Sequence, residues 1–120
     1  MKLGVQTLGL VLGIGGMAAT SLYGVDAPKG KELFEKKCAM CHAKDLKGNP
    51  AMAKMYQIDP SELNLISKES QSKTDAELIA ITTKGKAKMP AQQGKLTPEE
   101  IANVIAYVRS AAGPGGEKTK

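Results

Sequence analysis

The residues best placed to do chemistry in this chain are the five from Cys38 to His42, which read Cys-Ala-Met-Cys-His. Two thiols separated by two residues and followed directly by an imidazole form the attachment pattern for a c-type haem. The thiols form thioethers with the haem, and the histidine becomes an axial ligand of the iron. His42 is the only histidine in the chain. We therefore predict one covalently bound haem per chain, with Cys38, Cys41 and His42 as its attachment residues.

A Cys-x-x-Cys pair also occurs in thiol redox sites, structural zinc sites and disulfides. A thioredoxin-like site belongs to an alternating strand and helix pattern, and no β-rich alternating segment surrounds residues 38–41. A structural zinc site needs two further Cys or His ligands, and the sequence has none left. These exclusions favour haem attachment, with a disulfide or a thiol redox pair as the alternatives.

The N-terminal segment has the layout of a secretory signal, which we assign to residues 1–24. Lys2 precedes an uncharged run of 23 residues, with an apolar centre around residues 8–19. The run is long enough for an uncleaved membrane anchor, since about 20 apolar residues span a bilayer. Its six glycines and short apolar centre favour a cleaved signal, so we expect export, with the cleavage point left open.

We expect residues 25–112 to form one domain, and the glycine-rich residues 113–120 to form a flexible tail. The chain contains no Trp, one Phe and three Tyr, so protein aromatics alone make a thin core. A haem would supply the missing apolar bulk. The formal net charge is +5, from 17 Lys and Arg against 12 Asp and Glu.

Residue patterns typical of helix N-termini occur at several places in this domain, and strand patterns are absent. Asp26 with Pro28 can open a first helix that runs to about Cys38. Capping patterns, each with a Glu three residues after the cap, begin at Asp59, Thr74 and Thr97. The sequence therefore predicts an all-α domain.

The last predicted helix follows Thr97 and is the most periodic segment. One face carries apolar residues at helical spacing, and the polar residues fall elsewhere. The apolar set is Ile101, Val104, Ile105, Val108 and Ala112, and the polar set is Glu99, Glu100, Asn103 and Arg109.

With a haem motif directly after a first helix and an amphipathic last helix, the chain resembles the class I cytochromes c over roughly residues 28–112. Gly30 and Phe34 stand eight and four residues before Cys38, the spacing with which this family crosses its first and last helices. Gly30 would let the two backbones approach, and Phe34 would pack on the partner helix, with Tyr107 as its contact. The alternative for Gly30 is loop punctuation. The resemblance implies a small cytochrome c-like helical domain wrapped around one haem.

The resemblance also implies a distal methionine in the loop before the last helix, and Met89 with Pro90 occupies that place. Thioether sulfur is a soft ligand suited to low-spin haem iron. Met52 and Met55 are competitors that could instead pack in the core. We therefore expect His42 and Met89 to be the two iron ligands.

Two further residues have expected roles beside the haem. Pro50 resembles the family proline whose carbonyl accepts the second N–H of the proximal histidine, which would fix the tautomer and ring plane of His42. An ordinary turn proline is the alternative. Tyr56 is a candidate for contact with the haem propionates.

These expectations describe an exported one-electron carrier rather than an enzyme, because an iron saturated by His42 and Met89 has no open position for a substrate. One rival is a ligand-binding or peroxidase-like haem protein with an open sixth site. Another is a haem module of a membrane respiratory complex. The expected location is the periplasm, with a membrane-anchored form facing the periplasm as the alternative.

The expected partners are redox proteins with acidic docking surfaces, such as a membrane oxidase, reductase or dehydrogenase, and we expect no nucleic acid. Two lysine-rich segments flank the ligand residues in sequence, since Lys36 and Lys37 precede Cys38, and Lys84, Lys86 and Lys88 precede Met89. Positive charge near an exposed haem edge would steer acidic partners. Simple solvation of a small protein is the alternative role for these lysines.

Overall fold

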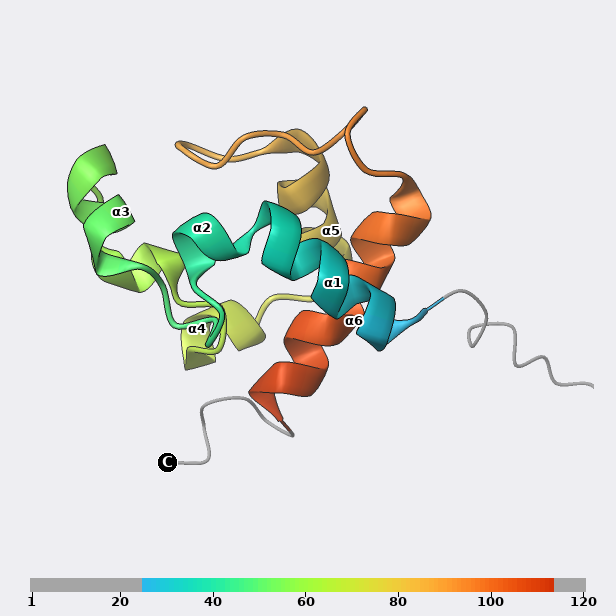
Figure 1. Cartoon of the computed structure of the whole chain (residues 1–120). Helices are drawn as coiled ribbons and strands as arrows, with labels where there is room; N and C mark the ends of the chain where they lie inside the picture. The colour runs from blue at the N-terminus through green and yellow to red at the C-terminus, as the bar shows by residue number, and fades with distance from the viewer. Residues whose placement is uncertain (1–24, 114–120) are drawn as a thin grey trace, which may run out of the picture.

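The computed structural model describes residues 25–113, and every regular element within them is a helix (Figure 1). In chain order these elements are α1 (Ala27–Lys37), α2 (Ala39–His42), α3 (Pro50–Tyr56), the 3-10 helix η2 (Pro60–Leu63), α4 (Lys68–Gln71), α5 (Asp75–Lys84) and α6 (Pro98–Ala112). The expected all-α fold is thus confirmed for the part of the chain that is described.

The expected signal segment, residues 1–24, and residues 114–120 of the expected tail lie outside the described residues. Between residues 25 and 113, no helix combines the length and the apolar character needed to cross a membrane.

The caps at the helix starts largely follow the sequence signals. Thr74 and Thr97 each form a full capping box with the Glu three residues on, so hydroxyl and carboxylate each accept a backbone N–H. Asp59 differs, because its Oδ1 accepts the N–H and the hydroxyl of Ser61, at 2.9 and 2.7 Å, rather than an N–H three residues on. Only the single turn η2 follows it.

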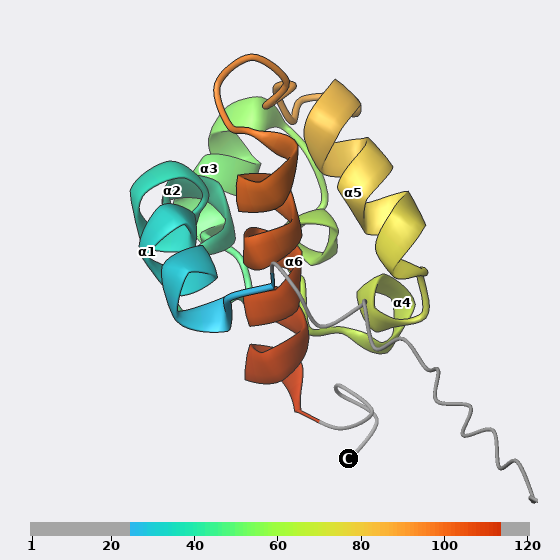
Figure 2. The ribbon, with the colours of Figure 1, turned by 90° about the vertical axis from the view of Figure 1, so that its right-hand side faces the viewer.

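Helices α1 and α6 cross at close range at the centre of the fold (Figure 2). A Cβ at Gly30 would lie 1.9 Å from the carbonyl oxygen of Asn103, so only glycine permits this approach. One turn later the Phe34 ring, only 1% exposed, packs on Tyr107 with the ring centroids 5.5 Å apart. The expected roles of Gly30 and Phe34 are confirmed, and the crossing fixes where the chain enters the haem motif.

Helix α6 is buried over a wider surface than its apolar stripe, because both α1 and α5 pack against it. The expected apolar positions Ile101, Val104, Ile105 and Val108 are buried. Asn103, which was expected away from the buried face, is only 7% exposed. Its Oδ1 accepts the backbone N–H of Asp26 at 2.7 Å, which ties the start of the domain to α6.

The C-terminal half of α6 holds the connection between α4 and α5 through the side chain of Arg109. The guanidinium donates to both oxygens of Gln71, at 3.1 and 3.2 Å, and to the Lys73 carbonyl. It also pairs with Asp75 Oδ1 at 2.8 Å. Arg109 was expected only on the polar side of the helix, and the structure gives it this anchoring role.

Candidate functional site

The Cys-x-x-Cys-His segment forms the short turn that follows α1. Cys38 ends α1, and its N–H donates to the Phe34 carbonyl at 2.8 Å. The N–H of His42 donates to the Cys38 carbonyl at 2.9 Å. Backbone hydrogen bonds therefore run from the buried Phe34 through Cys38 to His42. They connect the haem motif rigidly to the part of α1 that crosses α6.

The imidazole of His42 is buried and oriented by one hydrogen bond. Its Nδ1 lies 2.9 Å from the carbonyl oxygen of Leu63, the last residue of η2. Because a carbonyl only accepts, Nδ1 carries the hydrogen, and Nε2 is the nitrogen left to bind a metal. Burial lowers the pKa of His42, with the Leu63 carbonyl opposing this in part, so the neutral ring that a metal requires is favoured.

The expectation that the Pro50 carbonyl accepts this hydrogen bond was wrong. Pro50 is the first residue of α3, capped by the side chain of Asn49, which accepts the N–H of Ala51 at 3.0 Å. The chain turns into a helix at Pro50, and it is η2 that comes back beside His42. A backbone carbonyl carries no side-chain signature, so nothing in the sequence singled out Leu63.

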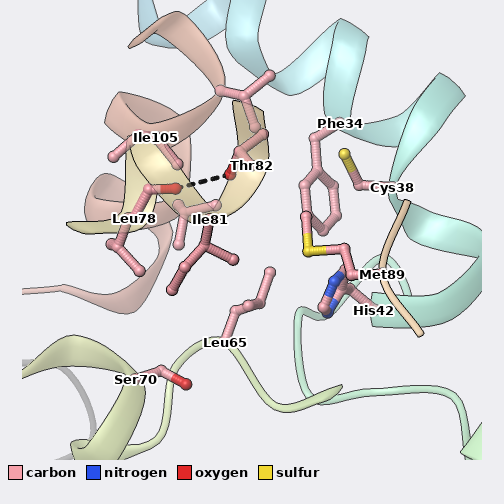
Figure 3. Close-up of a pocket in the computed structure, with 12 residues that line it drawn as sticks. Phe34, Cys38, His42, Leu65, Ser70, Leu78, Ile81, Thr82, Met89 and Ile105 are labelled. Carbon is pink, nitrogen blue, oxygen red and sulfur yellow. Dashed lines mark hydrogen bonds between the residues drawn. The ribbon is translucent and has the colours of Figure 1, made fainter. Parts of the chain in front are cut away.

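His42 faces a largely apolar pocket with about 530 Å³ of space that protein atoms leave empty, part of it open to solvent. In the view of Figure 3, His42, Met89, Phe34 and Cys38 are drawn on one side of the pocket, with Leu78, Ile81 and Ile105 on the other. The lining residues are Phe34, Cys38, His42, Leu65, Ser70, Leu78, Ile81, Thr82, Met89, Val104, Ile105 and Val108. Sequence reasoning had not placed Leu65, Leu78 or Ile81 at the site.

The two hydroxyls in the lining are already hydrogen-bonded within the protein. Thr82 donates to the Leu78 carbonyl at 2.8 Å, and Ser70 donates to the Asn64 carbonyl at 2.6 Å. The pocket therefore offers apolar surface, one thiol, one imidazole and one thioether.

Met89 reaches the pocket from a loop that the backbone holds in place. Lys86 and Met89 exchange two backbone hydrogen bonds, of 3.1 and 2.9 Å, around a tight turn. Beyond Met89, the N–H of Gln92 donates to the Thr82 carbonyl of α5 at 3.0 Å. The thioether is thus presented on a fixed loop between α5 and α6.

The other candidate side chains lie elsewhere. Neither Met52 nor Met55, both on α3, lines the pocket, and Met55 is 62% exposed. Tyr56, the candidate for propionate contact, is also outside the lining and partly exposed. Cys41 completes the motif but is not part of the lining either.

The Cys38 thiol does not resemble the reactive thiol of a redox pair. Burial, with a further contribution from Cys41, raises the pKa of the Cys38 thiol to about 11. Thiol redox enzymes need a thiolate and hold this pKa below its usual value. The pocket suits haem instead, since its lining is mainly apolar and brings an attachment thiol together with nitrogen and sulfur donors suited to iron.

Comparison with known proteins gives the same result. Residues 25–108 match the family described as cytochrome c oxidase, cbb3-type, subunit III. The chain belongs to the class I c-type cytochromes. Cytochrome c6 of Picosynechococcus sp. (strain ATCC 27264 / PCC 7002 / PR-6) is 35% identical over 96 residues, which cover 78% of this chain and 80% of that protein.

Two further relatives show that the chain is similar both to small cytochromes and to part of a longer oxidase subunit. The solved structure of cytochrome c6 from the diatom Phaeodactylum tricornutum aligns with a TM-score of 0.59 and 34% identity, over 75% of this chain and 98% of that one. The cbb3-type oxidase subunit FixP of Bradyrhizobium sp. (strain ORS 278) is 34% identical over 75% of this chain, but the match covers only 29% of FixP.

Membership in this family establishes the cofactor and the general activity. The chain is a monohaem c-type cytochrome with a covalently bound haem c, and Cys38 and Cys41 fit its attachment motif. It carries electrons between redox proteins and is not an enzyme.

Proposed function

We propose that His42 and Met89 would bind the haem iron in an exported one-electron carrier. The observation that supports this most directly is that both side chains line the same apolar pocket as the Cys38 thiol. When bound, the haem would supply one-electron chemistry. With His42 and Met89 both bound to the iron, no position would be open for a substrate.

Electron transfer needs iron ligands that do not move, and the protein around the pocket holds both ligand side chains in position. The Leu63 carbonyl holds the ring of His42, and the Lys86 turn holds Met89. The largely apolar lining would lower the polarity around the iron and so limit rearrangement between oxidation states. Electron transfer then needs contact between partners but no opening of the site.

The test of this function is a potentiometric titration combined with ligand binding. A saturated carrier gives a single one-electron wave, and its ferrous form does not bind carbon monoxide. Rapid carbon monoxide binding by the wild-type protein would instead support the ligand-binding alternative with an open sixth site. Met89→Ala serves as the positive control, because removal of the thioether opens that position.

The proposed location is the periplasm, on the strength of the signal-like residues 1–24. The holoprotein should appear in the periplasmic fraction with a mature N-terminus that retains Asp26, because the N–H of Asp26 is bonded to Asn103 and its side chain caps α1. A full-length haem protein found only in membranes would favour the anchored alternative.

The proposed partners present acidic docking surfaces. Residues 78–98 contain four lysines and no acidic residue, and Lys84, Lys86 and Lys88 are exposed beside the loop that carries Met89. Lys36 and Lys37 are exposed at the end of α1, next to Cys38. Both lysine groups adjoin residues of the pocket, and this positive charge supports docking of an acidic electron-transfer partner.

A second candidate function is that of a haem module in a membrane oxidase. It is supported by the match of the chain to a cbb3-type subunit and to a segment of FixP. Purification from native membranes distinguishes the two. A carrier is released by salt, whereas an oxidase module stays with the oxidase activity through detergent extraction and gel filtration.

A further inference from the structure

We propose that Gly48 is a positioning residue for His42, acting through the backbone of Leu63. The inference rests on the proposed role of His42 as an iron ligand. Its basis is that Gly48 contacts both residues of the hydrogen-bonded pair that orients the imidazole.

The first contact is with the backbone of the histidine. The N–H of Gly48 donates to the carbonyl oxygen of His42 at 2.8 Å, and the next N–H, of Asn49, donates to Cys41 at 2.9 Å. The loop that follows the haem motif therefore folds back onto it, and Gly48 lies directly against the ligand residue.

The second contact is with Leu63. Gly48 has φ +104°, and a Cβ there would lie 2.9 Å from the Cβ of Leu63 and 3.3 Å from its carbonyl carbon. These separations are shorter than ordinary van der Waals contact, so any side chain at residue 48 pushes Leu63 away. The carbonyl that moves is the one that accepts the His42 hydrogen bond.

The neighbours of Leu63 cannot absorb this displacement. On one side Asp59 caps η2 through Ser61, and on the other the N–H of Leu65 donates to the Leu46 carbonyl at 2.8 Å. The segment is pinned at both ends, so the strain acts on the 2.9 Å bond between Leu63 and His42.

A weaker bond to Nδ1 has a defined electronic consequence. A carbonyl that accepts from a metal-bound histidine makes the imidazole a more basic ligand, which favours ferric over ferrous iron. Loss of the bond therefore raises the reduction potential. Gly48, which is not part of the pocket lining, would in this way influence the potential of the carrier.

The first test compares Gly48→Ala with Gly94→Ala in the full-length holoprotein. Gly94 also has a positive φ, +86°, but a Cβ there meets nothing within 4 Å, so this control reproduces the backbone strain without the contact. We expect a higher midpoint potential in Gly48→Ala only, together with faster solvent exchange of the His42 Nδ1 proton in NMR spectra. A folded Gly48→Ala holoprotein with unchanged potential and exchange would overturn the proposal.

A surface variant keeps the proposal testable if Gly48→Ala does not fold. Asp59→Ala removes the cap of η2, whereas Asp59→Asn removes the same negative charge and keeps an oxygen acceptor. We expect a higher potential in Asp59→Ala than in Asp59→Asn, and equal potentials would contradict the role of the Leu63 segment. Failure of the ligand assignment itself would appear differently, as a wild-type spectrum without histidine ligation.

Discussion

A side chain on Gly30 would lie 1.9 Å from the carbonyl oxygen of Asn103, so the crossing of α1 and α6 depends on the absence of that side chain. Gly30→Ala must therefore separate the helices. In an exposed helix the same change would be stabilising. Here we expect a loss of about 3 kcal/mol in the free energy of unfolding, as for an overpacked core. Guanidinium unfolding measures it, and the exposed neighbour Lys31→Ala, expected within about 0.5 kcal/mol of wild type, is the control.

Arg109 should matter through the carbonyls it binds more than through its ion pair. Arg109→Gln removes donors to Gln71, Lys73 and Asp75, and we expect it to cost about 2 kcal/mol. Asp75→Asn removes only the exposed ion pair and should cost less than about 1 kcal/mol. Denaturant unfolding of both variants checks the order, and equal losses would show that the ion pair dominates.

The capping box of α5 should make a pH-dependent contribution to stability. Hydrogen bonds from the backbone and side chain of Thr74 lower the pKa of Glu77 below its usual value of 4.5. A lowered carboxyl pKa stabilises the fold above that value, and the contribution is lost as the pH falls through the pKa of the folded state. Glu77→Gln should thus be less stable than wild type at pH 7. The difference should vanish in thermal melts at low pH, and a constant difference would contradict the capping role.

The exposed lysines beside the Met89 loop should control the rate of partner encounter. Changing Lys84, Lys86 and Lys88 to Gln should slow electron transfer with a native membrane fraction at low salt, because electrostatic steering is lost. Added salt should slow the wild type, since the screening length is about 10 Å at 0.1 M ionic strength. The matched control changes Lys29, Lys31 and Lys68, which are exposed elsewhere, to Gln. Equal rates in the two triple variants would remove any special role of the loop lysines.

Attachment should depend on both thiols. With Cys38 and Cys41 both changed to Ala, we expect haem that acidic solvent extracts and a chain that is mostly unfolded, because the aromatic core is thin. Pyridine haemochrome spectra and circular dichroism measure the two effects. Recovery of a fully folded, haem-free domain from this variant would contradict a fold organised around haem.

Capping patterns in the sequence predicted α1, α5 and α6, but not α2, α3 or α4. The crossing at Gly30 and the contact of Phe34 with Tyr107 were predicted from the resemblance to the class I cytochromes c. The acceptor of the His42 hydrogen bond was missed because it is a backbone carbonyl of η2, which has no side-chain signature. Pro50, the residue expected to accept, is instead the first residue of α3. Asn103 was misplaced because helical periodicity describes one stripe, whereas α6 has neighbours on more than one side. What sequence could not supply were contacts made by the backbone and by the arrangement of helices.

The most direct test of the proposed site is the optical spectrum of the ferric protein and of its methionine variants. A bond between iron and a thioether gives a weak charge-transfer band at the red end of the visible spectrum. Because Met89 lines the pocket and Met52 and Met55 do not, the band should be present in wild type, Met52→Ala and Met55→Ala, and absent in Met89→Ala. Retention of the band in Met89→Ala, or its loss in Met55→Ala alone, would contradict ligation of the iron by His42 and Met89.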